Sequence, residues 1–141
     1  MRATNFSMKS GIYFVVGGAQ LDMHNDYDFT AFSYDVPTRA LLLTWRRRTI
    51  GEPTEVTLAV RDVTRLEVEP RRADLPFSED DCLNGVAYVC DEDWGREGFL
   101  TAGEPDDSWR WSFDFMSGAA IVVAAGTATL HLGPRAAEPR R

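Results

Sequence analysis

The amino-acid sequence predicts an all-β fold, either an antiparallel β-sandwich or a flattened barrel of about eight or nine strands with little helix. Three observations support this class. Short segments rich in β-branched and aromatic residues recur along the chain, turn-forming residues separate them, and apolar and polar residues alternate within several of them. None of the segments shows the apolar period of about 3.6 residues that marks an amphipathic helix.

The first predicted strands lie in the N-terminal third of the chain. Residues 11–17 (GIYFVVG) are β-branched or aromatic and end on glycine. Residues 27–34 (YDFTAFSY) and 39–47 (RALLLTWRR) form a predicted hairpin, because Pro37 presets the backbone of the turn and Asp35 can accept hydrogen bonds from the turn amides. This hairpin is the clearest in the sequence.

The remaining strands follow in the same manner. Apolar and polar residues alternate in 55–60 (EVTLAV) and 64–70 (TRLEVEP), whereas 84–90 and 97–102 are shorter candidates between acidic turns. In 108–115 (SWRWSFDF) every second residue is aromatic, which predicts a half-buried strand. The last predicted strand is 119–132 (AAIVVAAGTATLHL), in which Gly126 indicates a bulge or a close backbone approach.

The length and the charge of the chain limit its domain organisation and its choice of partners. A chain of 141 residues suits one domain, expected at 1–132 and followed by a polar tail at 133–141 that is expected to be disordered. The net charge of −7 disfavours nucleic acid, whose binders usually present a basic face. Lys9 is the only lysine, and the many arginine and alanine residues suggest a GC-rich bacterial genome.

Targeting signals are weak. The apolar run near the start reads better as a first strand that ends at Gly17 and Gly18 than as a secretory signal. No segment approaches the roughly 18 apolar residues of a membrane helix, so we expect a cytoplasmic protein without a membrane partner. Cys82 and Cys90 fit neither a redox motif nor a zinc ligand pair and are expected to be small buried residues. A bridge between them becomes plausible if the protein is secreted.

An acidic cluster with a histidine precedes the predicted hairpin. Asp22, His24, Asp26 and Asp28 recur at every second position of LDMHNDYDF. In an extended strand the first and last would lie about 20 Å apart, so one metal ion cannot bind all four. A calcium loop fails too, because Tyr27 stands where that loop needs glycine and Ser33 stands where it needs glutamate.

We therefore expect these four side chains to form the solvent-facing side of a strand, with Tyr27, Phe29 and Ala31 facing the core. An alternative stays open. His24 with Asp26 or Asp28 could bind a metal ion if other residues complete the site.

The other acidic segments are glycine-rich and are expected to be solvated loops. They could instead form an acidic rim for a basic protein partner, with Trp94 as an anchor beside Asp91, Glu92 and Asp106. That second interpretation requires an exposed tryptophan near these acids, and Trp45 and Trp109 are further candidates for it.

Sequence motifs for common enzyme chemistries are missing. The chain has no G-x-S-x-G elbow, no P-loop and no G-x-G-x-x-G motif, so we predict no cofactor and no catalytic residue. Only His24 and His131 are available for histidine-dependent chemistry, and each is more often structural than catalytic.

The order of several segments resembles that of small uncharacterised bacterial β-sandwich domains. In these domains an early His-Asp element precedes two long strands, a V-T-x-L-x-V strand follows, and the last strand opens with Ser-Gly. The matching segments are LDMHNDYDF (21–29), RALLLTW (39–45), EVTLAVRDVTRLEVEP (55–70) and WSFDFMSGAAIVVAAGTATLHL (111–132). Here Asn25 separates the histidine from the aspartate. Because some of these domains are similar to immunity proteins that neutralise partner toxins, the resemblance implies a non-enzymatic binding protein.

Three functional hypotheses result. The first is a non-catalytic protein-binding domain, for example an immunity-type protein with an acidic surface. The second is a small-ligand or metal-binding β domain, or an enzyme, that uses His24, Asp26 and Asp28. The third is a domain that self-associates, for example as a homodimer, through exposed strand edges.

Overall fold

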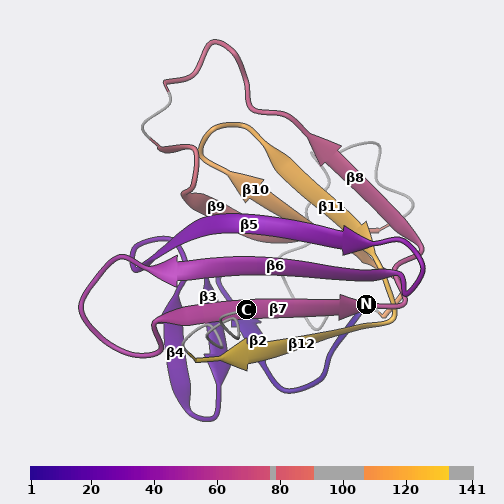
Figure 1. Ribbon diagram of the computed structural model, residues 1–141, viewed down its shortest axis with the longest axis horizontal. Coiled ribbons are helices and arrows are strands. Elements are labelled where there is room, and N and C mark those ends of the chain that lie inside the picture. Colours follow the sequence, from indigo (N-terminus) through magenta and orange to yellow (C-terminus); the bar gives the residue numbers. More distant parts are fainter. Residues whose placement is uncertain (77–78, 91–106, 134–141) are drawn as a thin grey trace, which may run out of the picture.

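The computed structural model describes residues 1–76, 79–90 and 107–133, and these residues form an all-β fold (Figure 1). Twelve strands are arranged in three sheets, and the described segments contain no α-helix. The predicted all-β class is therefore confirmed. The sheets do not close into a barrel in the part of the chain that is described.

The largest sheet has five strands, and we call it the large sheet. Its order is β1 (Arg2–Ala3), β12 (Thr127–Leu132), β7 (Glu55–Arg61), β6 (Ala40–Arg47) and β5 (Tyr27–Asp35). The second sheet has the order β8 (Arg65–Glu69), β11 (Ala120–Ala124), β10 (Arg110–Phe115) and β9 (Leu83–Val89). The third has the order β2 (Ser7–Lys9), β3 (Tyr13–Val16) and β4 (Ala19–Asp22).

A bent two-stranded ribbon connects the large sheet to the four-stranded sheet. The chain passes from β7 into β8, and in the opposite direction it passes from β11 into β12. At the bend the amide of Thr64 donates to the carbonyl of Ala124 at 2.9 Å, and the amide of Gly126 donates to the carbonyl of Arg61 at 3.0 Å. These bonds continue the pairing around the corner, which is how a strand pair passes between two sheets.

The three sheets share one hydrophobic core. Trp45 of the large sheet is fully buried and lies 6.3 Å from Phe113 of the four-stranded sheet, measured between ring centroids. Phe14 of the three-stranded sheet meets the same tryptophan edge-on at 5.9 Å. Phe29 packs on it from β5 at 5.2 Å. Aromatic pairs at such distances and angles add to the stability that burial provides.

The strand count differs from the expected eight or nine. Three short strands, β1, β2 and β4, lacked a sequence signal because strands of two to four residues are too short to show alternation. The predicted strand 119–132 is divided at Ala125 and Gly126, where the ribbon bends. The predicted strand 97–102 and the predicted tail from residue 134 lie outside the described residues.

The alternation expected along β5 was wrong at one position. The pairing with β6 shifts by one residue between Phe29 and Ala31, so Thr30 forms a bulge. Beyond a bulge the side chains change face. Ala31 therefore points to the solvent, while Phe32 takes the core-facing position.

No helix in the described residues is long and apolar enough to cross a membrane.

Candidate functional site

The acidic cluster before β5 forms a turn rather than a strand. Asp22 ends β4, and its carboxylate accepts hydrogen bonds from the amides of His24 at 3.1 Å and Asn25 at 2.9 Å. The side-chain amide of Asn25 donates to the same carboxylate at 2.8 Å. Burial acts to raise the pKa of Asp22, but these hydrogen bonds outweigh it and hold the pKa below its ordinary value of 3.8. Asp22 therefore stabilises the turn.

Arg47 connects this turn to the loop between β6 and β7. Its guanidinium lies 3.7 Å from the carboxylate of Asp26 and donates to the carbonyl of Glu52 at 2.9 Å. It also donates to the hydroxyl of Tyr27 at 3.3 Å, while that hydroxyl donates to the carbonyl of Pro53 at 2.9 Å. Burial raises the pKa of Tyr27 against the opposing effect of the arginine, so the phenol stays neutral and can donate.

Arg48 holds the other side of the same turn. Its side chain donates to the carbonyls of Asn25 at 2.8 Å and His24 at 3.3 Å, and it forms an ion pair with Asp28 at 3.4 Å. The arginines at the end of β6 are thus the partners of the acids at the start of β5. This pairing explains the acidic cluster without a metal ion.

Among the described residues of this region, only His24 and Cys82 bring together two groups that could take part in a reaction. The thiol sulfur lies 3.6 Å from Nδ1 of the imidazole. The same nitrogen lies 2.7 Å from the carbonyl oxygen of Leu83, which can only accept. Nδ1 therefore carries the proton and cannot take one from the thiol. Burial also raises the pKa of Cys82, so the sulfur is not activated as a nucleophile.

The predicted metal residues are not brought together as one ligand set. His24 turns toward Cys82, whereas Asp26 and Asp28 turn toward the two arginines. The described part of the chain contains no group of three or more His, Cys, Asp or Glu side chains that could hold a metal ion. The metal site therefore stays a prediction that the geometry does not favour.

The two cysteines lie at opposite ends of β9 and are not joined in a disulfide. Cys82 directly precedes the strand and Cys90 directly follows it. Eight residue steps of extended chain separate them by roughly 26 Å. A bridge needs Cα atoms within about 7 Å, so this fold excludes one between them.

The predicted protein-binding residues Trp94, Asp91, Glu92 and Asp106 lie outside the described residues. The other two candidate tryptophans are placed. Trp45 is fully buried in the core, and Trp109 is partly buried just before β10. Neither is an exposed anchor.

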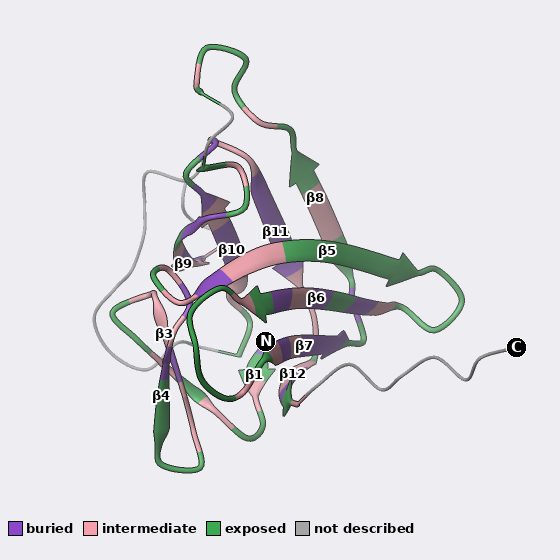
Figure 2. Cartoon of the chain, turned by 60° about the vertical axis from the view of Figure 1, so that its left-hand side comes forward, coloured by how far each residue is buried: buried purple, intermediate pink, exposed green. Residues whose placement is uncertain are grey.

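A group of exposed apolar side chains on the β5–β6 hairpin was missed by sequence analysis. Its members are Phe32 (43% exposed), Tyr34 (37%), Val36 (71%) and Leu42 (41%), and we call them the hairpin patch. They supply half of the eight large hydrophobic residues that are exposed in the described chain. Figure 2 shows that the second half of β5 is exposed, whereas β6, its neighbour in the sheet, carries buried residues along its length.

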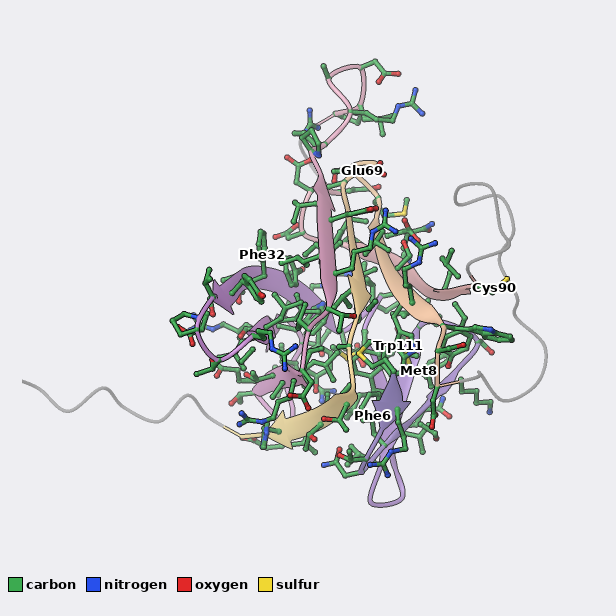
Figure 3. The ribbon with its side chains drawn as sticks, turned by 90° about the vertical axis from the view of Figure 1, so that its right-hand side faces the viewer. Phe6, Met8, Phe32, Glu69, Cys90 and Trp111 are labelled. Atoms are coloured by element: carbon green, nitrogen blue, oxygen red, sulfur yellow. The ribbon has the colours of Figure 1, made fainter. Side chains whose placement is uncertain are left out.

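Two of these residues are exposed although the register places them on the core-facing side of the sheet. Phe32 pairs with Leu43, and Tyr34 pairs with Leu41, so both lie on the side of the large sheet that faces the core. Both leucines are fully buried. The aromatic side chains belong to the edge strand of the sheet, in the half of β5 where every residue is exposed. In Figure 3 Phe32 lies apart from the buried Trp111.

The opposite face of the large sheet is unusually poor in charge. Its two central rows run across β5, β6, β7 and β12 and contain no Asp, Glu, Lys or Arg. The rows are Ser33, Leu42, Ala59 and Thr129, and Ala31, Thr44, Thr57 and His131. Depletion of charged residues is typical of the centre of a protein interface.

The chain was compared with models of known protein families, with curated proteins and with solved structures, and it matches none of them. Its function is therefore argued from its own geometry.

Proposed function

We propose that this chain is a non-catalytic protein-binding domain that uses the β5–β6 hairpin as its binding surface. The observation that carries the proposal is the hairpin patch, in which large apolar side chains gather at one end of one hairpin. Exposed apolar groups of this kind mark interaction sites more often than isolated ones do. The two uncharged central rows on the opposite face of the large sheet support the same surface.

The two sides of the patch suit an extended partner. Phe32 and Tyr34 lie on the core-facing side of the sheet, and Leu42 lies on the opposite side. A strand added at the edge of a sheet projects its side chains alternately to both sides. One extended segment could therefore contact all three residues.

Several finer features belong to the proposal. The large and four-stranded sheets act as the two layers of a β-sandwich, supported by the contact between Trp45 and Phe113 across the core. A cytoplasmic location is supported by Cys82 and Cys90, which are not joined in a disulfide. An immunity-type role with a basic partner would rest on the acidic segment from Asp91, which carries most of the net charge.

The alternative of a small-ligand, metal or catalytic site at His24, Asp26 and Asp28 receives less support. Each of these side chains has a protein partner, and the Nδ1 proton of His24 prevents it from activating Cys82. We therefore place the binding function on the hairpin instead.

Site-specific crosslinking tests the proposal. A photoreactive amino acid replaces Val36 in the turn of the hairpin, and in a matched chain it replaces Ile50, which is equally apolar and fully exposed in the loop at the other end of β6. In cells that express the chain naturally, we expect a discrete protein adduct from position 36 and none from position 50, identified by mass spectrometry.

The adduct should disappear when Phe32→Ser and Tyr34→Ser are added, while the circular dichroism spectrum stays native. An equal adduct pattern from positions 36 and 50, or no adduct from position 36, would contradict the proposal.

A further inference from the structure

The three sheets have six edge strands, and five of them are protected against pairing with another strand. An unpaired edge offers backbone groups to any other strand, and proteins block this with charge, short strands or covering segments. β1, β2 and β4 have only two to four residues. β8 carries Arg65, Glu67 and Glu69, and in β9 the amide of Val86 is bonded at 2.7 Å to the carbonyl of Gly11.

Within residues 1–76, 79–90 and 107–133, none of these protections is found on the second half of β5. The strand is nine residues long, and its residues from Thr30 to Asp35 are all exposed. Between Phe29 and Tyr34 it contains neither a charged residue nor a proline. The bulge at Thr30 lies at the first residue of the exposed part, so the pairing continues without a shift from Ala31 to Asp35. The carbonyl of Asp81 accepts a hydrogen bond from the amide of Phe29, so the first half of the strand is covered.

The exposed part of β5 is complementary to itself. If two copies pair antiparallel about an axis through Ser33, Phe32 of each copy lies opposite Tyr34 of the other. Ser33 lies opposite its own copy, and Ala31 lies opposite Asp35. Aromatic pairs directly across two strands are stabilising, and a small residue at the axis allows close approach. No two like charges face one another in this register.

The distribution of charge makes this edge less repulsive to a second copy than the other surfaces of the chain. The chain has a net charge of −7, so two copies repel each other over most of their surfaces. Asp35 is the single acid in the exposed strand, and its carboxylate is bonded to the amide of Thr38 in the turn at 3.1 Å. An approach along β5 therefore brings few unpaired acids together.

We propose that two copies of this chain form a dimer through antiparallel pairing of their β5 strands about Ser33, which joins the two large sheets into one continuous sheet. The proposal rests on the binding function assigned to the hairpin, and it names the partner. An edge contact of this length buries less than the roughly 1,200 Å² of a standard interface, so the dimer is expected to be weak and concentration-dependent.

A charge exchange at the axis tests this register. Ser33→Lys places two lysines opposite each other, and Ser33→Glu places two glutamates opposite each other, so each variant alone should bind itself at least about tenfold more weakly than the parent. An equimolar mixture should recover the dimer, because the lysine of one chain then faces the glutamate of the other. Ser7→Lys, at an exposed serine of β2, is the matched control and should dimerise like the parent.

Sedimentation equilibrium from about 1 μM to about 1 mM measures the dissociation constants, a range suited to weak association. A parent that stays monomeric throughout overturns the dimer. A parent dimer that Ser33→Lys leaves intact places the interface elsewhere, and loss in both variants without recovery in the mixture excludes pairing about Ser33. If the dimer fails while Val36 still crosslinks to a different protein, the binding function stands and only the choice of partner is wrong.

Discussion

Asp22 shows how a single carboxylate organises the turn that precedes β5. Its three hydrogen bonds to His24 and Asn25 fix residues whose carbonyls accept hydrogen bonds from Arg48, directly after β6. Each such bond contributes on the order of 1 kcal/mol when the donors would otherwise lack a partner. The residue is therefore structural, and its charge should appear in the pH dependence of stability.

We expect Asp22→Ala to lower the free energy of unfolding by about 1–2 kcal/mol at pH 7, because the amides of the turn lose their acceptor. The pKa of Asp22 is lowered in the folded state, so its contribution is present above its ordinary value of 3.8 and is lost as the pH falls through the folded value. Urea unfolding between pH 7 and about pH 2.5 measures the difference in the free energy of unfolding between parent and variant. Asp81→Ala, at an exposed residue, is the control. A difference between parent and variant that stays constant to the lowest pH would contradict the assignment.

At the scale of elements, the bent ribbon decides how the sheets are connected. Asp62 sits at the bend with a φ of 57°, a left-handed conformation that aspartate and asparagine tolerate better than β-branched residues. Its ion pair with Arg39 at 3.7 Å joins two exposed side chains and contributes little. The backbone conformation is thus the main constraint at this position.

Asp62→Val should reduce stability by about 1–2 kcal/mol, because the left-handed conformation is costly for a β-branched residue. Asp62→Asn removes the same charge but tolerates the conformation, so it should unfold close to the parent. Thermal and urea unfolding of the two variants distinguish the effect of the backbone conformation from that of the ion pair with Arg39. If both variants lose the same stability, the ion pair rather than the backbone would be responsible.

At the scale of the whole molecule, the aromatic core joins all three sheets. Trp45 contacts Phe14, Phe29 and Phe113, which come from three different strands and all three sheets. A residue shared in this way couples the sheets, so none of them is expected to unfold alone. The hairpin patch lies outside this core, and its substitution should leave the stability nearly unchanged.

Trp45→Ala is expected to destabilise the protein by about 3–5 kcal/mol, the range for loss of a fully buried tryptophan. Because the core is common to the sheets, near-ultraviolet and far-ultraviolet circular dichroism should report one coincident transition in urea for the parent. Two separate transitions would show that the sheets unfold independently. Ile50→Ala, at a fully exposed site, serves as the neutral control.

The sequence by itself determined the fold class and most of the long strands. Alternation and β-branched composition are local properties, and local pattern is enough to predict β5, β6, β7 and β10 as strands. Turn chemistry is local too, and the predicted bond from Asp35 to the turn of the hairpin is confirmed at Thr38.

Only the tertiary structure decided the sites. That Asp26 and Asp28 pair with Arg47 and Arg48 depends on a contact across some twenty residues of chain, which no local pattern contains. The bulge at Thr30 reverses the faces of β5, and the position of β5 at the end of its sheet leaves Phe32 exposed. Burial depends on which strand becomes an edge, and strand order is fixed by packing among distant segments rather than by the residues of the strand itself.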